Sequence, residues 1–154
     1  MKYMDMIVSE TLRKWPAAIT TDRMCSKSYT IEAVNPGEHA IHLKPGDVVV
    51  VPINGIHRDS KYFPNTDTFD PERFGDENKG NIKPYTYMPF GLGPRNCIGS
   101  RFAILETKTI FFYMLSKFNF VAIDKTQIPI KLCRKNLNPV GENGMWIGIE
   151  PRTN

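Results

Sequence analysis

A single cysteine set in a glycine-rich run constrains this chain more than any other feature of its sequence. The run covers residues 90–99 and reads FGLGPRNCIG, with Cys97 as its only cysteine. Glycine permits left-handed or tight backbone and the close approach of a ligand. A predicted helix begins just after Gly99, and the amide groups and positive dipole end of a helix N-terminus stabilise a negative sulfur. These residues by themselves predict a functional thiolate at Cys97, either a metal ligand or a nucleophile.

The composition is that of an ordinary folded domain. With 154 residues, 41% of them hydrophobic and 23% charged, the chain is long and apolar enough to bury a core. The net charge of +4 is mild and basic residues alternate with acidic ones, so we expect no nucleic-acid partner. The three cysteines lack C-x-x-C spacing, which disfavours a disulfide framework, a zinc ribbon and a covalent c-type haem. The sequence has no apolar run long enough to span a membrane.

Apolar spacing and turn residues predict a mixed α+β organisation. Apolar residues recur at helical spacing over 4–12, and Trp15-Pro16 should end that helix. A second, well-buried helix is expected over about 100–118, with its aromatic side chains in the core. Residues 57–89 should form a long ordered loop. The predicted strands lie at 29–31, 41–43, 48–53, 120–123, 128–132 and 145–149, the first three in one small curled sheet.

Three motifs, taken together, resemble the cytochrome P450 family. Residues 90–99 match every fixed position of its haem-binding signature, F-G-x-G-x-R-x-C-x-G. Residues 10–13, ETLR, resemble the E-x-x-R motif of its K helix, and residues 71–74, PERF, resemble its meander motif. The similarity extends along the chain and is strongest to microsomal animal members, insect ones included. It implies the C-terminal portion of that fold, α+β here and mainly α in the family, as a single partial domain over residues 1–154. The parts implied are the K helix, a small β-sheet, the meander, the haem-thiolate loop, the L helix and a C-terminal β-hairpin.

The resemblance implies how a haem would be held. Cys97 corresponds to the axial thiolate ligand of the iron in haem b, which makes it the metal-binding residue. Arg95 and Arg23 correspond to arginines that pair with the haem propionates. Phe90 belongs to the same cofactor-binding segment.

Other matched residues are implied to support the site or to meet the substrate. Glu10, Arg13 and Arg73 correspond to a buried ion-pair network that holds the meander beneath the haem. Ala18 and Thr20 fall in a substrate-contact segment, with ordinary strand positions as the alternative for each. A turn near 136–139 resembles a second substrate-contact region.

The function implied by the resemblance is monooxygenation, in which one oxygen atom of O2 enters a small lipophilic substrate of xenobiotic or steroid type. The implied partners are NADPH-cytochrome P450 reductase and cytochrome b5, at the cytoplasmic face of the endoplasmic reticulum membrane. Family members carry an N-terminal anchor and an oxygen-activating helix that these residues do not match. We therefore expect a C-terminal fragment that is inactive in isolation, with a non-catalytic haem-binding fragment as the alternative function.

A cysteine-nucleophile enzyme is the rival from another class, but it needs a positioned base and the histidines lie far from Cys97 in the sequence. The three histidines do not form a metal-ligand pattern. Cys25 and Cys133 are expected to be small buried hydrophobes. A dinucleotide-binding fingerprint is rejected because its third glycine would fall on Asn96. The basic residues Lys83, Arg95, Arg101 and Lys108 predict either a surface for an acidic electron donor or a solvated face of mixed charge.

Overall fold

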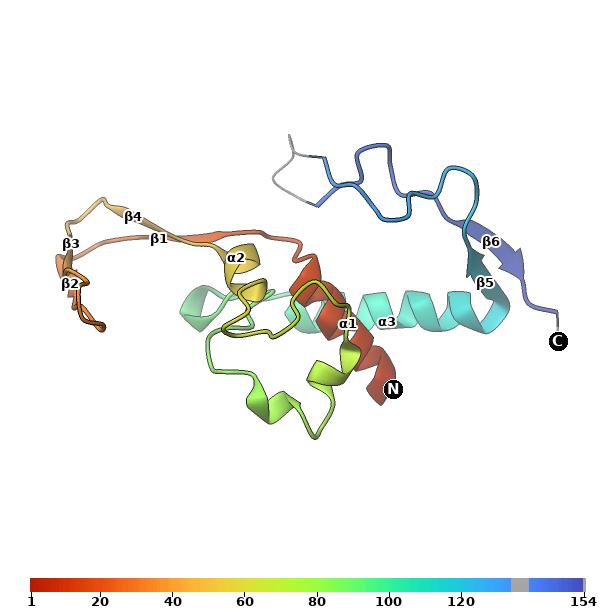
Figure 1. Cartoon of the computed structure of the whole chain (residues 1–154), viewed down its shortest axis with the longest axis horizontal. Helices are drawn as coiled ribbons and strands as arrows, with labels where there is room; N and C mark the ends of the chain where they lie inside the picture. The colour runs from red at the N-terminus through yellow and green to blue at the C-terminus, as the bar shows by residue number, and fades with distance from the viewer. Residues whose placement is uncertain (134–138, 154) are drawn as a thin grey trace. The chain divides into compact units, whose positions relative to one another are not determined.

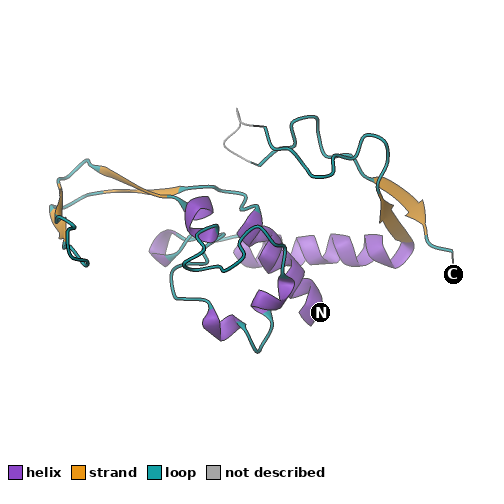
Figure 2. Cartoon of the chain, viewed as in Figure 1, coloured by secondary structure: helices purple, strands orange, loops and turns teal. Residues whose placement is uncertain are grey.

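The computed structural model describes residues 1–133 and 139–153 (Figure 1). The chain divides into two compact units, one made of Met1–Ile19 with Ile53–Asn154 and the other of Thr20–Pro52. Helices and small antiparallel sheets occur together, which confirms the predicted α+β class (Figure 2). None of the helices among the described residues is both long and apolar enough to cross a membrane.

The first unit is organised around helix α1, Lys2–Lys14. The Trp15 N–H donates to the Thr11 carbonyl, and Trp15-Pro16 ends the helix as predicted. Helix α1 contacts the short helix α2, Ile53–His57, and the 3-10 helix η1, Pro71–Phe74.

The buried face of α1 is not the apolar one. Its buried side chains are Met6, Glu10 and Arg13. The apolar residues that predicted the helix, from Met4 to Leu12, are only half-buried and line a cleft on another face. Charged side chains occupy the core here because their hydrogen-bonding groups find partners in the segment that follows α2.

That segment, residues 58–89, is ordered without long helices or strands, as predicted. Besides η1 it contains the 3-10 helix η2, Lys79–Asn81. The Asp70 carboxylate caps η1 by accepting the Glu72 N–H at 3.1 Å. Phe63 anchors the segment in the core with 2% of its surface exposed.

Helix α3, Ser100–Lys117, confirms the second predicted helix but not its burial. Among the described residues, none of its side chains is buried. Phe102 is 69% exposed and Phe112 47%, so the expectation that the aromatic residues of α3 form core is wrong. Among the described helices and strands, α3 packs mainly against α1 and the strand that follows it. These two elements leave most of its apolar surface uncovered.

The last strands form a two-stranded antiparallel sheet of β5, Phe118–Val121, and β6, Gly148–Pro151. Strand β5 begins two residues before its predicted range, 120–123, and β6 ends two residues after its predicted range, 145–149. The strand predicted at 128–132 is wrong, because only an isolated bridge from Leu132 to Gly141 forms there. The predicted tight turn before β6 is present, with Gly144 at φ 82°.

The second unit consists of two antiparallel pairs instead of one curled sheet. Strand β1, Thr21–Met24, pairs with β4, Val48–Val51, and β2, Tyr29–Ile31, pairs with β3, Ile41–Leu43. The turns at Gly37 and Gly46 have φ of 87° and 96°, as their turn signals predict. Strand β4 ends at Val51, so the strand predicted up to Ile53 is too long by Pro52 and by Ile53, which begins α2.

Candidate functional site

The cysteine loop is closed by its own backbone. The Cys97 N–H donates to the Phe90 carbonyl at 2.9 Å, and the Asn96 N–H donates to the Gly93 carbonyl at 3.1 Å. Gly91 and Gly93 have φ of 71° and 78°, a left-handed region in which other residues are strained. Gly99 differs from this pattern, since it has φ −88° and serves as the N-cap of α3.

Cys97 is exposed and lies three residues before Ser100, the first residue of α3. The positive end of that helix favours a negative charge on the sulfur. Arg95, in the 3-10 helix η3, Gly93–Arg95, is exposed on the same loop. Apolar side chains on both sides of Cys97 in the chain are also exposed, with Leu92 at 38% before it and Ile98 at 104% after it. The loop therefore presents a sulfur, a cation and apolar surface together.

Glu10 and Arg13 form a fully buried ion pair, each with 0% exposure. Their contact is bidentate, with Arg13 Nε at 2.7 Å from Glu10 Oε2 and Arg13 Nη2 at 2.8 Å from Oε1. Arg73 Nε lies 3.6 Å from Glu10 Oε1, which is an ion-pair distance but too long for a hydrogen bond. The structure thus brings the three matched charged residues together.

Backbone groups supply further hydrogen-bond partners to this ion-pair network. Arg13 donates through Nη1 to the His57 carbonyl and through Nη2 to the Thr66 carbonyl, both at 2.9 Å. The Asp70 N–H donates to Glu10 Oε1 at 3.0 Å. Because these partners are carbonyls and an amide, sequence motifs gave no signal for them, and only the Asp70 side chain is a recognisable capping residue.

We expect Arg13→Met to lower the free energy of unfolding by about 3–5 kcal/mol, because it leaves the Glu10 carboxylate buried without its main partner. Urea denaturation measures this change. Lys79→Met is the matched control, since Lys79 pairs with Asp76 on the exposed surface and should cost less than about 1 kcal/mol. Equal, small losses in both variants would contradict the buried-pair assignment.

His57 connects this network to the chain that leads to Cys97. It is 0% exposed, and its Nε2 accepts the Met88 N–H at 2.9 Å. The ring stacks on Tyr87 with centroids 5.4 Å apart. Burial lowers the pKa of His57 from 6.5 to about 4; neighbouring backbone groups of Arg13 and Leu12 oppose this, and the Arg13 guanidinium adds to it. His57 is therefore neutral in the folded protein at physiological pH.

This pKa predicts an acid-sensitive stability. Between pH 6.5 and about 4 the unfolded chain binds a proton at His57 that the folded chain does not. The free energy of unfolding should therefore fall as pH is lowered through this window, by about 3 kcal/mol from this group, and change no further below it. Urea denaturation at several pH values measures the slope. In His57→Gln that part of the slope should vanish, and an unchanged slope would refute the assignment.

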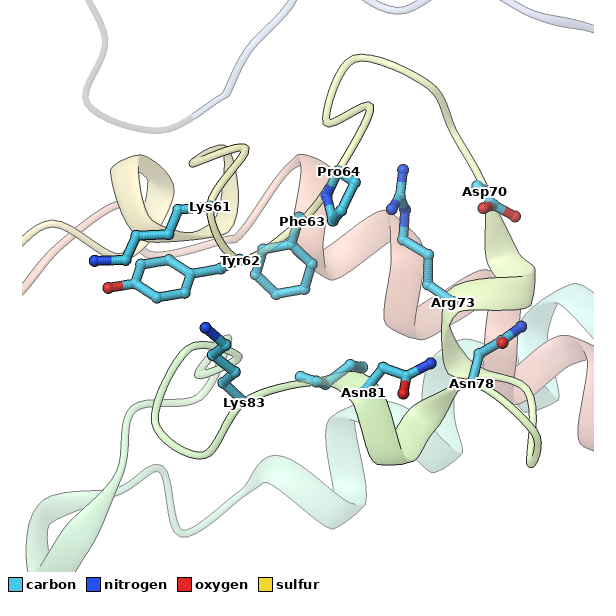
Figure 3. A pocket seen from close by; sticks show the side chains of 10 residues that line it. Lys61, Tyr62, Phe63, Pro64, Asp70, Arg73, Asn78, Asn81 and Lys83 are labelled. Atoms are coloured by element: carbon cyan, nitrogen blue, oxygen red, sulfur yellow. The ribbon is translucent and has the colours of Figure 1, made fainter.

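A pocket of about 400 Å³ borders the network at Arg73 (Figure 3). Side chains of residues 61–64 line one side of it, and those of Asn78, Asn81 and Lys83 line the other. The ammonium groups of Lys61 and Lys83 lie 5.6 and 5.9 Å from the centroid of the Tyr62 ring. Cys97 does not line this cavity, so it is separate from the cysteine loop.

An apolar cleft of about 840 Å³ lies between α1 and α3. It is lined by the apolar residues of α1 together with Phe90, Ile104 and Phe111. Phe90 of the signature therefore faces this cleft, whereas Arg95 and Cys97 are not among its lining residues.

The other residues matched to the family, Arg23, Ala18 and Thr20, lie outside the cysteine loop. Arg23 is in β1 opposite Val49, and its Nη1 donates to Thr21 Oγ1 at 3.0 Å. Ala18 and Thr20 are exposed and precede β1. Neither is therefore a strand residue, which was the alternative to substrate contact for each. Residues 136–138 of the second substrate-contact turn are outside the described residues. Cys25 and Cys133 are half-buried, not fully buried as expected.

Comparison with known proteins identifies the family. The family model described as Cytochrome P450 matches residues 1–143. Cytochrome P450 9e2 of Blattella germanica is 54% identical over 154 residues, which is 100% of this chain and 28% of the relative. Cytochrome P450 9b2 of Drosophila melanogaster is 43% identical over 152 residues, 99% of this chain and 30% of the relative. Cytochrome P450 3A1 of Rattus norvegicus is 44% identical over 137 residues, 89% of this chain and 26% of the relative.

The chain therefore belongs to the cytochrome P450 family, as its motifs predicted. It spans under a third of the length of these relatives. The family implies a haem whose iron is held by a cysteine thiolate.

The residues of the cysteine loop fit that cofactor. An exposed sulfur at a helix N-terminus suits an anionic ligand, and exposed apolar side chains beside it suit a flat apolar ring. Among residues 1–133 and 139–153 no three His, Cys, Asp or Glu side chains cluster to hold a metal. A haem needs no such cluster, because the porphyrin supplies four of the donors to its iron.

Proposed function

We propose that this chain carries the haem-thiolate centre of a monooxygenase that inserts one oxygen atom of O2 into a small lipophilic substrate, xenobiotic or steroid-like. The observation that carries the proposal is Cys97, exposed in a glycine-shaped loop at the N-terminus of α3, within a sequence of this family. When bound, haem b supplies the oxygen activation and the electron transfer.

In this proposal the chain holds the cofactor from one side. Cys97 would hold the iron through its sulfur, at the N-terminus of α3. Arg95, on the same loop, pairs with a propionate, and Arg23 pairs with the other. Phe90 packs at the base of the loop, where its carbonyl accepts the Cys97 N–H.

The buried network is proposed to hold the segments beneath the cofactor rigid. Glu10, Arg13 and Arg73 link α1 to residues 57–73 through contacts that water does not reach. Ala18 and Thr20 are exposed, which leaves their side chains accessible to a substrate.

The proposed electron donors are NADPH-cytochrome P450 reductase and cytochrome b5, at the cytoplasmic face of the endoplasmic reticulum membrane. Acidic groups on a donor would meet basic side chains near the cysteine loop. The Lys108 ammonium already pairs with the Asp5 carboxylate. The proposed surface for the electron donor therefore consists of the exposed residues Lys83, Arg95 and Arg101.

A carbon monoxide difference spectrum of the reduced, haem-loaded protein tests the ligand. We expect the thiolate-type band in the unmodified protein and its complete loss in Cys97→Ala. Cys133→Ala is the matched control and should keep the band, because Cys133 is half-buried in another part of the chain. A thiolate-type band that survives in Cys97→Ala refutes the proposal.

The second candidate function, haem binding without turnover, is favoured by the exposed apolar side chains of α3, which lack a covering partner among the described residues. Measured turnover of a lipophilic substrate with reductase and NADPH distinguishes the two. Haem uptake with the thiolate band but without turnover would favour the second.

A further inference from the structure

His57 is a buried titratable side chain that the proposed function does not use. Its ring lies among Tyr87 and Phe63, with centroids 5.4 and 6.2 Å away, and none of its surface is exposed. An apolar residue would fill such a space without the cost of burying two ring nitrogens. The imidazole must therefore offer something that an apolar side chain does not.

What it offers is a hydrogen-bond acceptor. Nε2 accepts the Met88 N–H, so this nitrogen carries no proton and the neutral ring bears its proton on Nδ1. Among the described residues, Nδ1 has no hydrogen-bond partner. The hydrogen bond that the ring makes is through Nε2, and its partner is a buried backbone amide that would otherwise be unsatisfied.

Hydrogen bonds, joined by short stretches of backbone, link the buried ion pair through His57 to Cys97. Arg13 donates to the His57 carbonyl at 2.9 Å, and Met88 donates to the His57 ring at 2.9 Å. The Gly91 N–H then donates to the Met88 carbonyl at 3.0 Å, and the Cys97 N–H donates to the Phe90 carbonyl at 2.9 Å. Met88 is the last buried residue before the exposed loop, so its position sets where the loop begins.

We propose that His57 is a positioning residue for Cys97, which anchors the start of the cysteine loop to the Glu10–Arg13 pair by accepting the Met88 N–H. This inference rests on the proposed role of Cys97 as haem ligand. In this proposal His57 acts on the loop through the backbone of Met88.

Three variants separate anchoring from general packing. His57→Leu fills a similar volume but leaves the Met88 N–H buried without an acceptor. His57→Gln places an amide oxygen near the position of Nε2 and can accept that N–H. Tyr87→Phe is the matched control, because it removes a different, partly buried hydrogen bond, from the Tyr87 hydroxyl to the Ser9 carbonyl, and keeps the ring.

The readout is the ratio of thiolate-type to other carbon monoxide bands in the reduced, haem-loaded protein. We expect this ratio to fall roughly tenfold in His57→Leu, as one unpaired buried N–H implies. It should return close to the original value in His57→Gln and stay unchanged in Tyr87→Phe. Equal ratios in His57→Leu and Tyr87→Phe, or no recovery in His57→Gln, would overturn the proposal.

Two measurements without haem keep the inference testable even if His57→Leu folds poorly. In the unmodified protein, nitrogen NMR should find the His57 proton on Nδ1, and the Met88 amide should exchange with solvent far more slowly than the exposed Asn96 amide. A proton on Nε2, or equally fast exchange, would overturn the anchoring role. Absence of any thiolate band in the unmodified protein would instead refute the proposed function, while these measurements would still decide whether His57 holds Met88.

Discussion

The Glu10–Arg13 ion pair is the interaction on which the first unit depends. Two charges without exposed surface are tolerable only if their remaining donors and acceptors are satisfied. That requirement draws the carbonyls of His57 and Thr66, the amide of Asp70 and the side chain of Arg73 toward one point on α1. A segment with little regular secondary structure is ordered in this way, because the ion pair supplies the partners that a helix or sheet would otherwise provide.

The same unit combines a rigid interior with an exposed reactive loop. Buried rings and hydrogen bonds extend from Arg13 through His57 to Met88, and beyond Met88 the chain emerges at Gly91. Left-handed glycines then turn the loop so that Cys97 precedes α3 with its sulfur accessible. A metal ligand needs both properties, since its backbone must be held in place while its sulfur remains open to the cofactor.

Local patterns predicted many elements of the fold and failed where burial depends on distant segments. Helical spacing located α1 and α3, and glycine turns located β2, β3 and the turn at Gly144. The same spacing indicated the wrong buried face for α1, because apolar periodicity cannot report that Glu10 and Arg13 will find partners. It also indicated burial for α3, although the described chain covers little of that helix.

By itself the sequence determined the family and predicted the candidate site residues, because the motif around Cys97 depends on residue types at short, fixed spacing. It did not show which groups His57 contacts. Only the tertiary structure showed them, since the Arg13 guanidinium reaches the His57 carbonyl across 44 residues and the Met88 N–H reaches its ring across 31. The physical reason is that a backbone amide or carbonyl carries no side-chain signature, so its partner is known only once folding has brought the two together.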